Sequence, residues 1–230
     1  MLLVERVETW GFEHAIRGMR NPYDSWDKSD SVNAWVQSAS SDTPNKPIYR
    51  FVVGEQDLEL MRKLYKGGSE HRKYLRQIFV SLDITAPLYW WKEFDTYKVG
   101  TVANSCSTMH TIHKKEFELE DFSIEHLSDE NIEVAYINGF YSDSPKSSFI
   151  NLINVMNSCR DEYLKTKDKK YWWQLIQLLP SSYNQKRTIT MNYENIISMI
   201  KQRSGHKLDE WHTLIDEFKK LPYVVEIMEG

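Results

Sequence analysis

The chain has 230 residues and a formal net charge of −4, which argues against the dominant basic surface of generic nucleic-acid binders. Its apolar runs are shorter than the roughly 18 residues that cross a bilayer, and the N-terminal segment MLLVERVETW carries early charges, so neither a membrane span nor a secretory signal is expected. Two cysteines, Cys106 and Cys159, are too few for a disulfide framework, which favours a reducing, cytoplasmic location. Cys106 is expected to be a small buried side chain.

Hydrophobic periodicity and turn residues divide the chain into short strands and longer helices. The first half predicts a strand over 2–8, a helical turn over 12–19, a polar loop over 38–47, a helix over 54–65, a strand over 77–85 and a helix from Pro87 to Gly100. The second half predicts a charged surface segment over 114–133 and helices over 149–164, 171–178 and 209–219. We expect one α/β (α+β) domain with more helix than strand, whose aromatic residues, 13% of the chain, mainly fill the core.

Three segments could contribute polar groups to a ligand site. The strand over 77–85 alternates, and its mixed second face could form the floor of a site. The small, polar segment 101–110 suits a loop that lets the backbone approach a ligand, or an ordinary connector. The turn-rich segment 20–31 contains Arg20 and Trp26, which with Arg17 could hold a phosphate or a base, and a solvated loop is the equal alternative.

The sequence His110-Thr-Ile-His113, followed by Glu116, has the composition of a metal site. The two imidazoles would share one face only on a helix, and no further ligands follow at a zinc-like spacing, so solvated histidines without a metal are expected. No G-x-G-x-x-G or phosphate-loop motif is present, so a nucleotide cofactor would not be held by a dinucleotide-binding turn.

Residues 192–203 predict a helix with one basic residue on an otherwise apolar face. At about 100° per residue, Ile196, Met199, Ile200 and Arg203 all fall on the side of Asn192. A guanidinium on a core-facing stripe needs an anion, because an unpaired buried charge is costly. A bound anionic ligand and an internal carboxylate both satisfy this requirement.

The segment also carries a family resemblance. Leu179-Pro180, Thr190, Asn192 and Arg203 match in spacing the C-terminal signature of the flavin-dependent thymidylate synthases. The stretch HRKYLRQIFVSLDITAP, residues 71–87, is similar to the His…Ala-Pro strand of that family, and residues 88–107 follow where the family has Q-x-x-R-H-R-x-x-S-x-N-E-x-S. These blocks and their order extend over about half of the chain.

The resemblance implies a single domain over 1–230, in which a small, mostly antiparallel sheet packs against several helices. It implies FAD bound at the subunit interfaces of a homotetramer, with NADPH and methylenetetrahydrofolate as co-substrates. The implied reaction transfers a one-carbon unit to C5 of a pyrimidine deoxynucleotide such as dUMP. The implied partners are therefore a pyrimidine nucleotide and further copies of the chain, with no nucleic acid and no membrane.

The resemblance also implies roles for six residues. Arg203 is the catalytic residue, which polarises the uracil carbonyl so that C5 becomes nucleophilic. The nucleotide would also be bound by Glu93, which stands where the family has Gln, and by Asn104 and Ser107. Lys98 and Asn192 would contact the flavin.

The match departs from the family at several cations. The R-H-R triplet reads Thr96-Tyr97-Lys98, and Glu194 stands where an arginine follows the helix asparagine. N-E-x-S reads Asn104-Ser105-Cys106-Ser107. These changes leave open the family reaction, a relative that uses another nucleotide or donor, and a non-catalytic nucleotide-binding or structural homologue.

Overall fold

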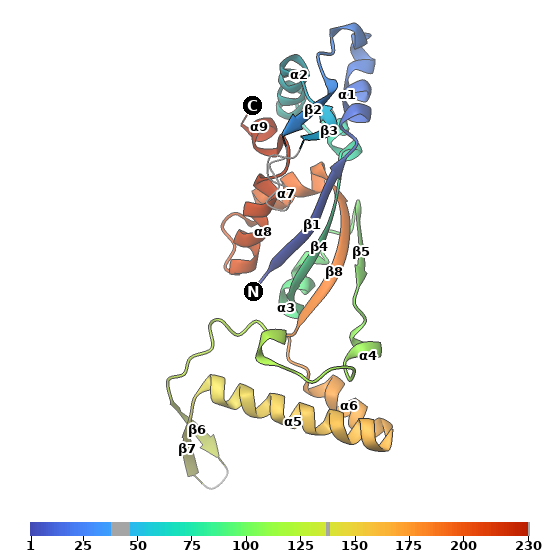
Figure 1. The fold of residues 1–230 in the computed structure, drawn as a ribbon. Helices are drawn as coiled ribbons and strands as arrows, with labels where there is room; N and C mark the ends of the chain where they lie inside the picture. The colour runs from blue at the N-terminus through green and yellow to red at the C-terminus, as the bar shows by residue number, and fades with distance from the viewer. Residues whose placement is uncertain (38–46, 137–138, 230) are drawn as a thin grey trace.

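The computed structural model describes residues 1–37, 47–136 and 139–229. Its centre is a four-stranded antiparallel sheet with the strand order β1-β4-β8-β5 (Figure 1). The strands of this sheet are β1 (Leu3–Trp10), β4 (Phe79–Pro87), β8 (Asn184–Asn192) and β5 (Thr101–Ser105). The expected polar loop over 38–47 lies outside the described residues except for Pro47, which begins the strand β3.

Two hairpin-like ribbons and a set of helices complete the described chain. The ribbons pair β2 (Val32–Gln37) with β3 (Pro47–Val52) and β6 (Ile132–Tyr136) with β7 (Gly139–Asp143). The helices are α1 (Phe12–Arg20), α2 (Glu55–Lys66), α3 (Leu88–Phe94), α4 (Thr108–Thr111), α5 (Pro145–Thr166), α6 (Lys169–Leu178), α7 (Tyr193–Arg203), α8 (Asp209–Lys219) and α9 (Val224–Met228). The small antiparallel sheet with many helices confirms the predicted fold class.

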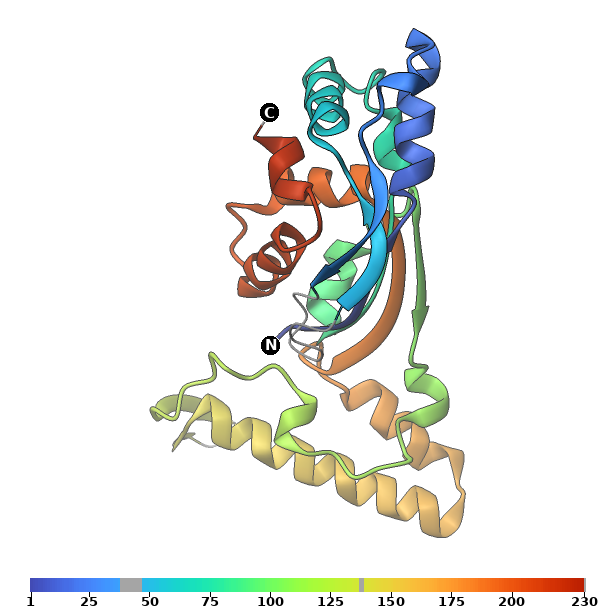
Figure 2. The same ribbon diagram turned by 45° about the horizontal axis from the view of Figure 1, so that its top comes forward.

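Helices α3, α7 and α8 lie on one face of the sheet and enclose the main core (Figures 1 and 2). Alternate residues of β4 and β8 point into this core and are buried. Four aromatic rings from α3 and α8 join them, namely Trp90, Trp91, Phe94 and Trp211. Aromatic side chains thus fill the core, as the composition predicts.

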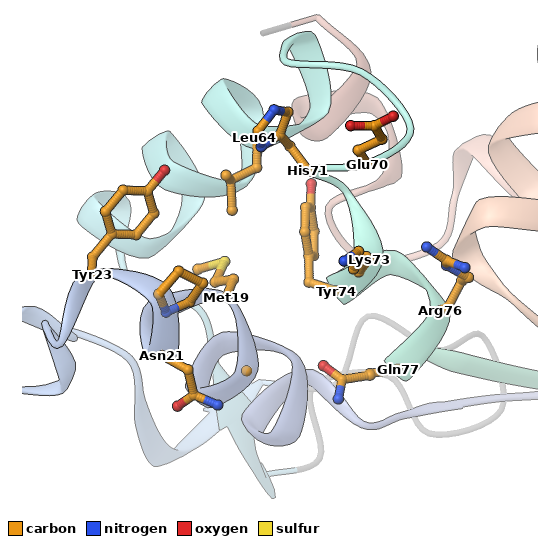
Figure 3. A pocket seen from close by; sticks show the side chains of 12 residues that line it. Met19, Asn21, Tyr23, Leu64, Glu70, His71, Lys73, Tyr74, Arg76 and Gln77 are labelled. Carbon is orange, nitrogen blue, oxygen red and sulfur yellow. The ribbon is translucent and has the colours of Figure 1, made fainter.

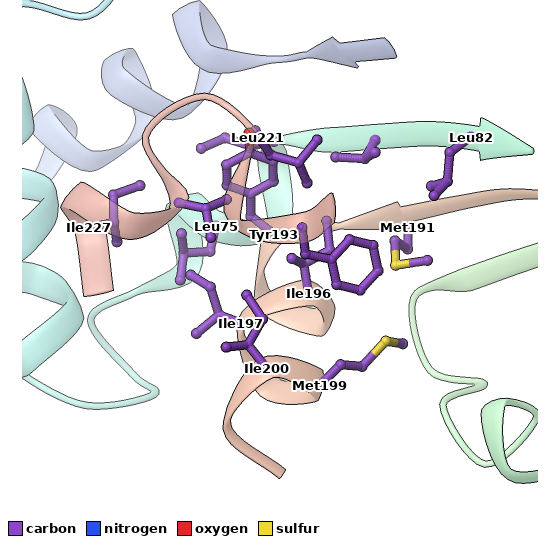
Figure 4. Close-up of a cluster of buried hydrophobic side chains, with 14 of the residues drawn as sticks. Leu75, Leu82, Met191, Tyr193, Ile196, Ile197, Met199, Ile200, Leu221 and Ile227 are labelled. Carbon is purple, nitrogen blue, oxygen red and sulfur yellow. The ribbon is translucent and has the colours of Figure 1, made fainter. Parts of the chain in front are cut away.

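The start of α7 anchors the C-terminal helices to the core. Tyr193 is fully buried, and its hydroxyl donates a hydrogen bond to the carbonyl of Pro222 at 2.8 Å. Figure 4 shows Tyr193 among side chains from α7, the sheet and the C-terminal segment. The position of α7, and therefore of Arg203, is fixed by this packing.

A second hydrophobic cluster lies on an arm formed by α5, α6 and the chain between α4 and β6 (Figure 1). Phe117 and Phe122 are buried in it, so the segment 114–133 is only partly the charged surface that the sequence predicts. The sequence analysis did not identify these two rings as buried, because most of the residues next to them in the sequence are charged. The predicted helices over 149–164 and 171–178 are present and slightly longer.

Two strands of the central sheet, β8 and β5, were missed by the sequence analysis, as were the strands of both two-stranded ribbons. The polar run before Asn192 forms β8, which pairs with both β4 and β5 at the centre of the sheet. The segment expected as a loop over 101–110 begins with the edge strand β5. Both strands carry polar residues because no helix in the described chain covers the second face of the sheet. The helix that begins after Pro87 ends at Phe94 rather than near Gly100.

Candidate functional site

Helix α7 presents the apolar face that its sequence predicts. Asn192 caps it, because its side-chain oxygen accepts a hydrogen bond from the Asn195 amide at 3.1 Å. Ile196, Met199 and Ile200 are buried. The stripe carries Arg203 to the C-terminal end of the helix, where basic side chains also interact favourably with the helix dipole.

Arg203 is held by side chains from α3, the following turn and α8. Its Nη1 donates to Oε2 of Glu93 at 3.0 Å, and its Nε donates to the Tyr97 hydroxyl at 2.9 Å. The guanidinium also lies 4.9 Å from the ring centroid of Trp211, within cation–π range. The sequence left open whether Arg203 pairs with a bound anionic ligand or with an internal carboxylate. The structure provides the internal carboxylate, which is Glu93.

Glu93 is the centre of this cluster. Besides Arg203, Oε2 faces Nε2 of His206 at 3.0 Å and accepts from the Trp211 indole at 3.3 Å. Three donors thus converge on one oxygen, while Oε1 lies outside these three contacts. The side chains of Arg203 and Glu93 keep exposures of 20% and 36%, so a ligand can still reach both groups.

A hollow of about 580 Å³ lies next to the start of α7. Its walls come from the segment 69–76, the turn after α3 and the first turns of α7, and they include Tyr97, Gly100, Asn192 and Asn195. Gly100 has a φ of +76°, and a Cβ at this position would meet Nδ2 of Asn192 at 2.8 Å. Glycine therefore allows the backbone to approach the asparagine closely.

Tyr97 connects the hollow to the Arg203 cluster. It lines the hollow, while its hydroxyl accepts from Arg203 and donates to Oε1 of Gln202 at 2.9 Å. A ligand in the hollow is therefore separated from the guanidinium by one aromatic side chain. Asn192 therefore lines the hollow, Glu93 and Arg203 form the adjacent cluster, and Tyr97 contributes to both.

The other three predicted site residues lie elsewhere. Lys98 is exposed and does not line the hollow. Ser107 caps the short helix α4, where its hydroxyl accepts from the His110 amide at 3.4 Å. Asn104 pairs with Thr188 and shares its face of the sheet, which is opposite to the face covered by α7. Within one chain, Asn104 and Arg203 therefore cannot line the same cavity.

Two cations near the hollow were missed by the sequence analysis. Lys73 and Arg76, from the 3-10 helix η3 (Lys73–Gln77), line it and are exposed. Arg72, the residue before Lys73, is already engaged, with Nε 3.0 Å from a carboxylate oxygen of Glu194. No motif in the sequence distinguishes these two residues from the other basic residues of the segment.

The loop that could have held a phosphate or a base has a structural role at Arg20. This arginine is buried, and its Nε donates to Oδ1 of Asp57 at 2.6 Å. The other carboxylate oxygen accepts from the hydroxyls of Ser29 and Ser31, each at 2.6 Å. Burial alone would raise the pKa of Asp57, but these hydrogen bonds and the Arg20 charge outweigh it and hold the pKa below 3.8.

The histidine pair and Cys106 differ in their surroundings. Helix α4 ends at Thr111, so His110 and His113 do not share a helix face, and His113 packs edge-on against Tyr163. Among the described residues, no group of three or more His, Cys, Asp or Glu side chains is placed to hold a metal. Cys106 is exposed rather than buried, because it follows an edge strand.

In residues 1–37, 47–136 and 139–229, no helix is both long enough and apolar enough to cross a membrane.

No protein-family model and no curated protein matches this sequence. Solved structures do match it in fold. The flavin-dependent thymidylate synthase from Helicobacter pylori, crystallised with FAD and dUMP, superposes with a TM-score of 0.62 at 16% sequence identity, over 98% of both chains. The UMP/dUMP methylase PolB from Streptomyces cacaoi, bound with 5-Br UMP, gives a TM-score of 0.60 at 12% identity, over 98% of this chain and 92% of that one.

The chain therefore has the fold of the flavin-dependent thymidylate synthases, as its motifs predict. The same methylase bound with 5-Br dUMP superposes with a TM-score of 0.57 at 13% identity, over 98% of this chain and 93% of that one.

Proposed function

We propose that this chain is a flavin-dependent enzyme that modifies C5 of a pyrimidine nucleotide. The observation that carries the proposal is the hollow at the start of α7 beside Arg203, in a fold whose solved relatives hold FAD with dUMP or bind UMP and dUMP analogues. In its most specific form, the reaction transfers a one-carbon unit from methylenetetrahydrofolate to C5 of dUMP, and NADPH reduces the FAD.

The residues around the hollow fit a flavin nucleotide. A volume of about 580 Å³ lies within the roughly 300–1,000 Å³ typical of small-molecule and cofactor sites. Asn192 and Asn195 supply amide groups, and Gly100 leaves the backbone open beside them. When bound, the flavin supplies hydride. Tyr97 then forms the wall between this cofactor and the Arg203 cluster.

Arg203 and Glu93 together match the edge of a pyrimidine ring. The guanidinium donates to a ring carbonyl oxygen and stabilises negative charge that develops there. Oε1 of Glu93 accepts a hydrogen bond from a ring N–H, which increases electron density in the ring. Both contacts favour C5 as a nucleophile, and their energy is largest where water is excluded.

The nucleotide site is shared between copies of the chain in this proposal. Asn104 lies on the open face of the sheet and Arg203 on the covered side, so a nucleotide that touches both must lie between two chains. We propose a homotetramer, as the family resemblance implies. Analytical ultracentrifugation at micromolar concentration tests this, and a monomer would exclude the shared site.

A nucleotide-binding protein without transferase activity is the second candidate. It is favoured by one observation, which is that Glu93 already neutralises Arg203 inside the chain. The two candidates are separated by release of tritium from the C5 position of dUMP in the presence of FAD, NADPH and methylenetetrahydrofolate. Release above the background of a Tyr97→Ala/Arg203→Ala protein supports the enzyme, whereas dUMP binding without release supports the second candidate.

A further inference from the structure

The helix η3 lies between two hollows. One is the hollow beside Asn192. The other has a volume of about 770 Å³ and is lined by the segments 18–23 and 70–77 and by Leu64 of α2, which Figure 3 shows arranged around it. Glu70, Lys73 and Arg76 line both hollows. The two spaces therefore meet at these three side chains.

Two of the three shared side chains are cations that have no partner among the described residues. Lys73 and Arg76 are exposed, and neither makes a side-chain hydrogen bond or ion pair within the described part of the chain. The neighbouring Arg72 is neutralised by Glu194. Glu70 is also exposed and opposes the cations, so the boundary between the hollows carries two positive charges and one negative charge.

The walls of the two hollows differ in chemistry. The larger hollow is lined by apolar and aromatic residues, among them the buried Met19 and Leu64 and the exposed Tyr23, whose ring suits the face of a flat base. The smaller one offers the amide side chains of Asn192 and Asn195, which suit a polar ring edge. A ligand that filled both would therefore have two ring systems joined by an anionic linker.

We propose that Lys73 and Arg76 bind the phosphoanhydride of a dinucleotide that crosses η3, with one half in each hollow. The inference rests on the flavin cofactor proposed above and assigns its phosphates to this boundary. Arginine offers a planar fork that fits two phosphate oxygens, and lysine adds a point charge.

This assignment explains how the chain could hold phosphates although the R-H-R triplet reads Thr96-Tyr97-Lys98. Only one cation remains in that triplet, and Lys98 does not line either hollow. The required positive charge is supplied by η3 instead.

The test uses a Lys73→Ala/Arg76→Ala variant, titrated with FAD and with ADP-ribose. The matched control is Lys63→Ala/Lys66→Ala, which removes two exposed cations of the adjacent helix α2 that line neither hollow. We expect the first variant to lose about tenfold or more in affinity for both ligands, and the control to keep the wild-type affinity. Unfolding temperature should be unchanged in both, because the four side chains are exposed.

The outcomes separate this inference from the proposed function. Unchanged FAD affinity in the η3 variant overturns the inference and leaves the flavin cofactor standing. A wild-type protein that binds ADP-ribose through Lys73 and Arg76 but not FAD keeps the inference and refutes the flavin. A wild-type protein that binds neither ligand at millimolar concentration overturns both. In addition, Glu70→Gln should tighten ADP-ribose binding severalfold, because it removes the opposing charge, and weaker binding would contradict the charge balance proposed here.

Discussion

Arg203 Nη1 lies 3.0 Å from Glu93 Oε2, and the same oxygen is within 3.0 Å of His206 Nε2. The cation at the centre of the proposed nucleotide site is thus already neutralised inside the chain. A bound nucleotide must compete with this contact or use the groups that it leaves free.

A double-mutant cycle of Arg203→Ala and Glu93→Gln tests this competition. Arg203→Ala should abolish dUMP binding and lower the free energy of unfolding by only about 1–2 kcal/mol, because the pair is partly exposed and Glu93 keeps two other donors. Glu93→Gln should tighten dUMP binding, because the Arg203 charge becomes available to the ligand while the glutamine oxygen can still accept from the ring N–H. Calorimetric titration and thermal unfolding measure both effects.

Two results would contradict this account. A loss of stability of about 3–5 kcal/mol in Arg203→Ala with unchanged dUMP affinity would make the pair purely structural. Weaker dUMP binding in Glu93→Gln would mean that the negative charge itself contributes to recognition. Glu59→Gln, on the exposed side of α2, controls for the change in net charge.

The buried pair of Arg20 and Asp57 should be far more important for stability than the Arg203 pair. Asp57→Asn leaves the Arg20 charge without its carboxylate in a buried position, where the expected cost is about 3–5 kcal/mol. Asp27→Asn, an exposed change in the same loop, should cost little. Equal melting temperatures for the two variants would refute the structural role assigned to Arg20.

The same carboxylate predicts a dependence of stability on pH. The pKa of Asp57 is lower in the folded protein than its ordinary value of 3.8, so the unfolded chain binds the proton more readily. The contribution to stability is therefore complete above pH 3.8 and is lost as the pH falls below it. Urea unfolding at pH 6 and below pH 4 should show that the difference in free energy of unfolding between wild type and Asp57→Asn becomes smaller in acid. The same difference in free energy of unfolding at both pH values would contradict the lowered pKa of Asp57.

The hollow depends on the backbone at Gly100. Gly100→Ala places a Cβ at a φ of +76° and 2.8 Å from Asn192 Nδ2, so both the turn and the asparagine must shift. We expect weaker FAD binding and a cost of about 1–2 kcal/mol in stability. Gly205→Ala is the matched control, because a Cβ there meets no atom within 4 Å and its φ is ordinary. Normal FAD affinity in Gly100→Ala would place the flavin elsewhere.

Much of the fold follows from local patterns in the sequence. The helices that begin near Glu55 and Asp209 have apolar stripes and clear stops, and they lie within one or two residues of their predicted bounds. The strand β4 alternates because one of its faces is buried. The motif order around Asn192 and Arg203 was sufficient to predict the antiparallel sheet and the family of folds.

The rest depends on tertiary context. β8 reads as a polar run because Thr188 and Thr190 face the open side of the sheet, and only its two neighbouring strands identify it as central. The partner of Arg203 could not be predicted, because Glu93 lies 110 residues away in the sequence. Lys73 and Arg76 show no motif, and the role proposed for them rests on the hollows that they border.

The most direct test of the central claim is a titration of the purified protein with FAD, followed by flavin absorbance and fluorescence, before and after addition of dUMP. The account predicts saturable FAD binding at micromolar concentration and a further spectral change with dUMP that is lost in Arg203→Ala. No spectral change at a hundred micromolar FAD, with or without dUMP, would contradict a flavin-dependent pyrimidine-nucleotide enzyme.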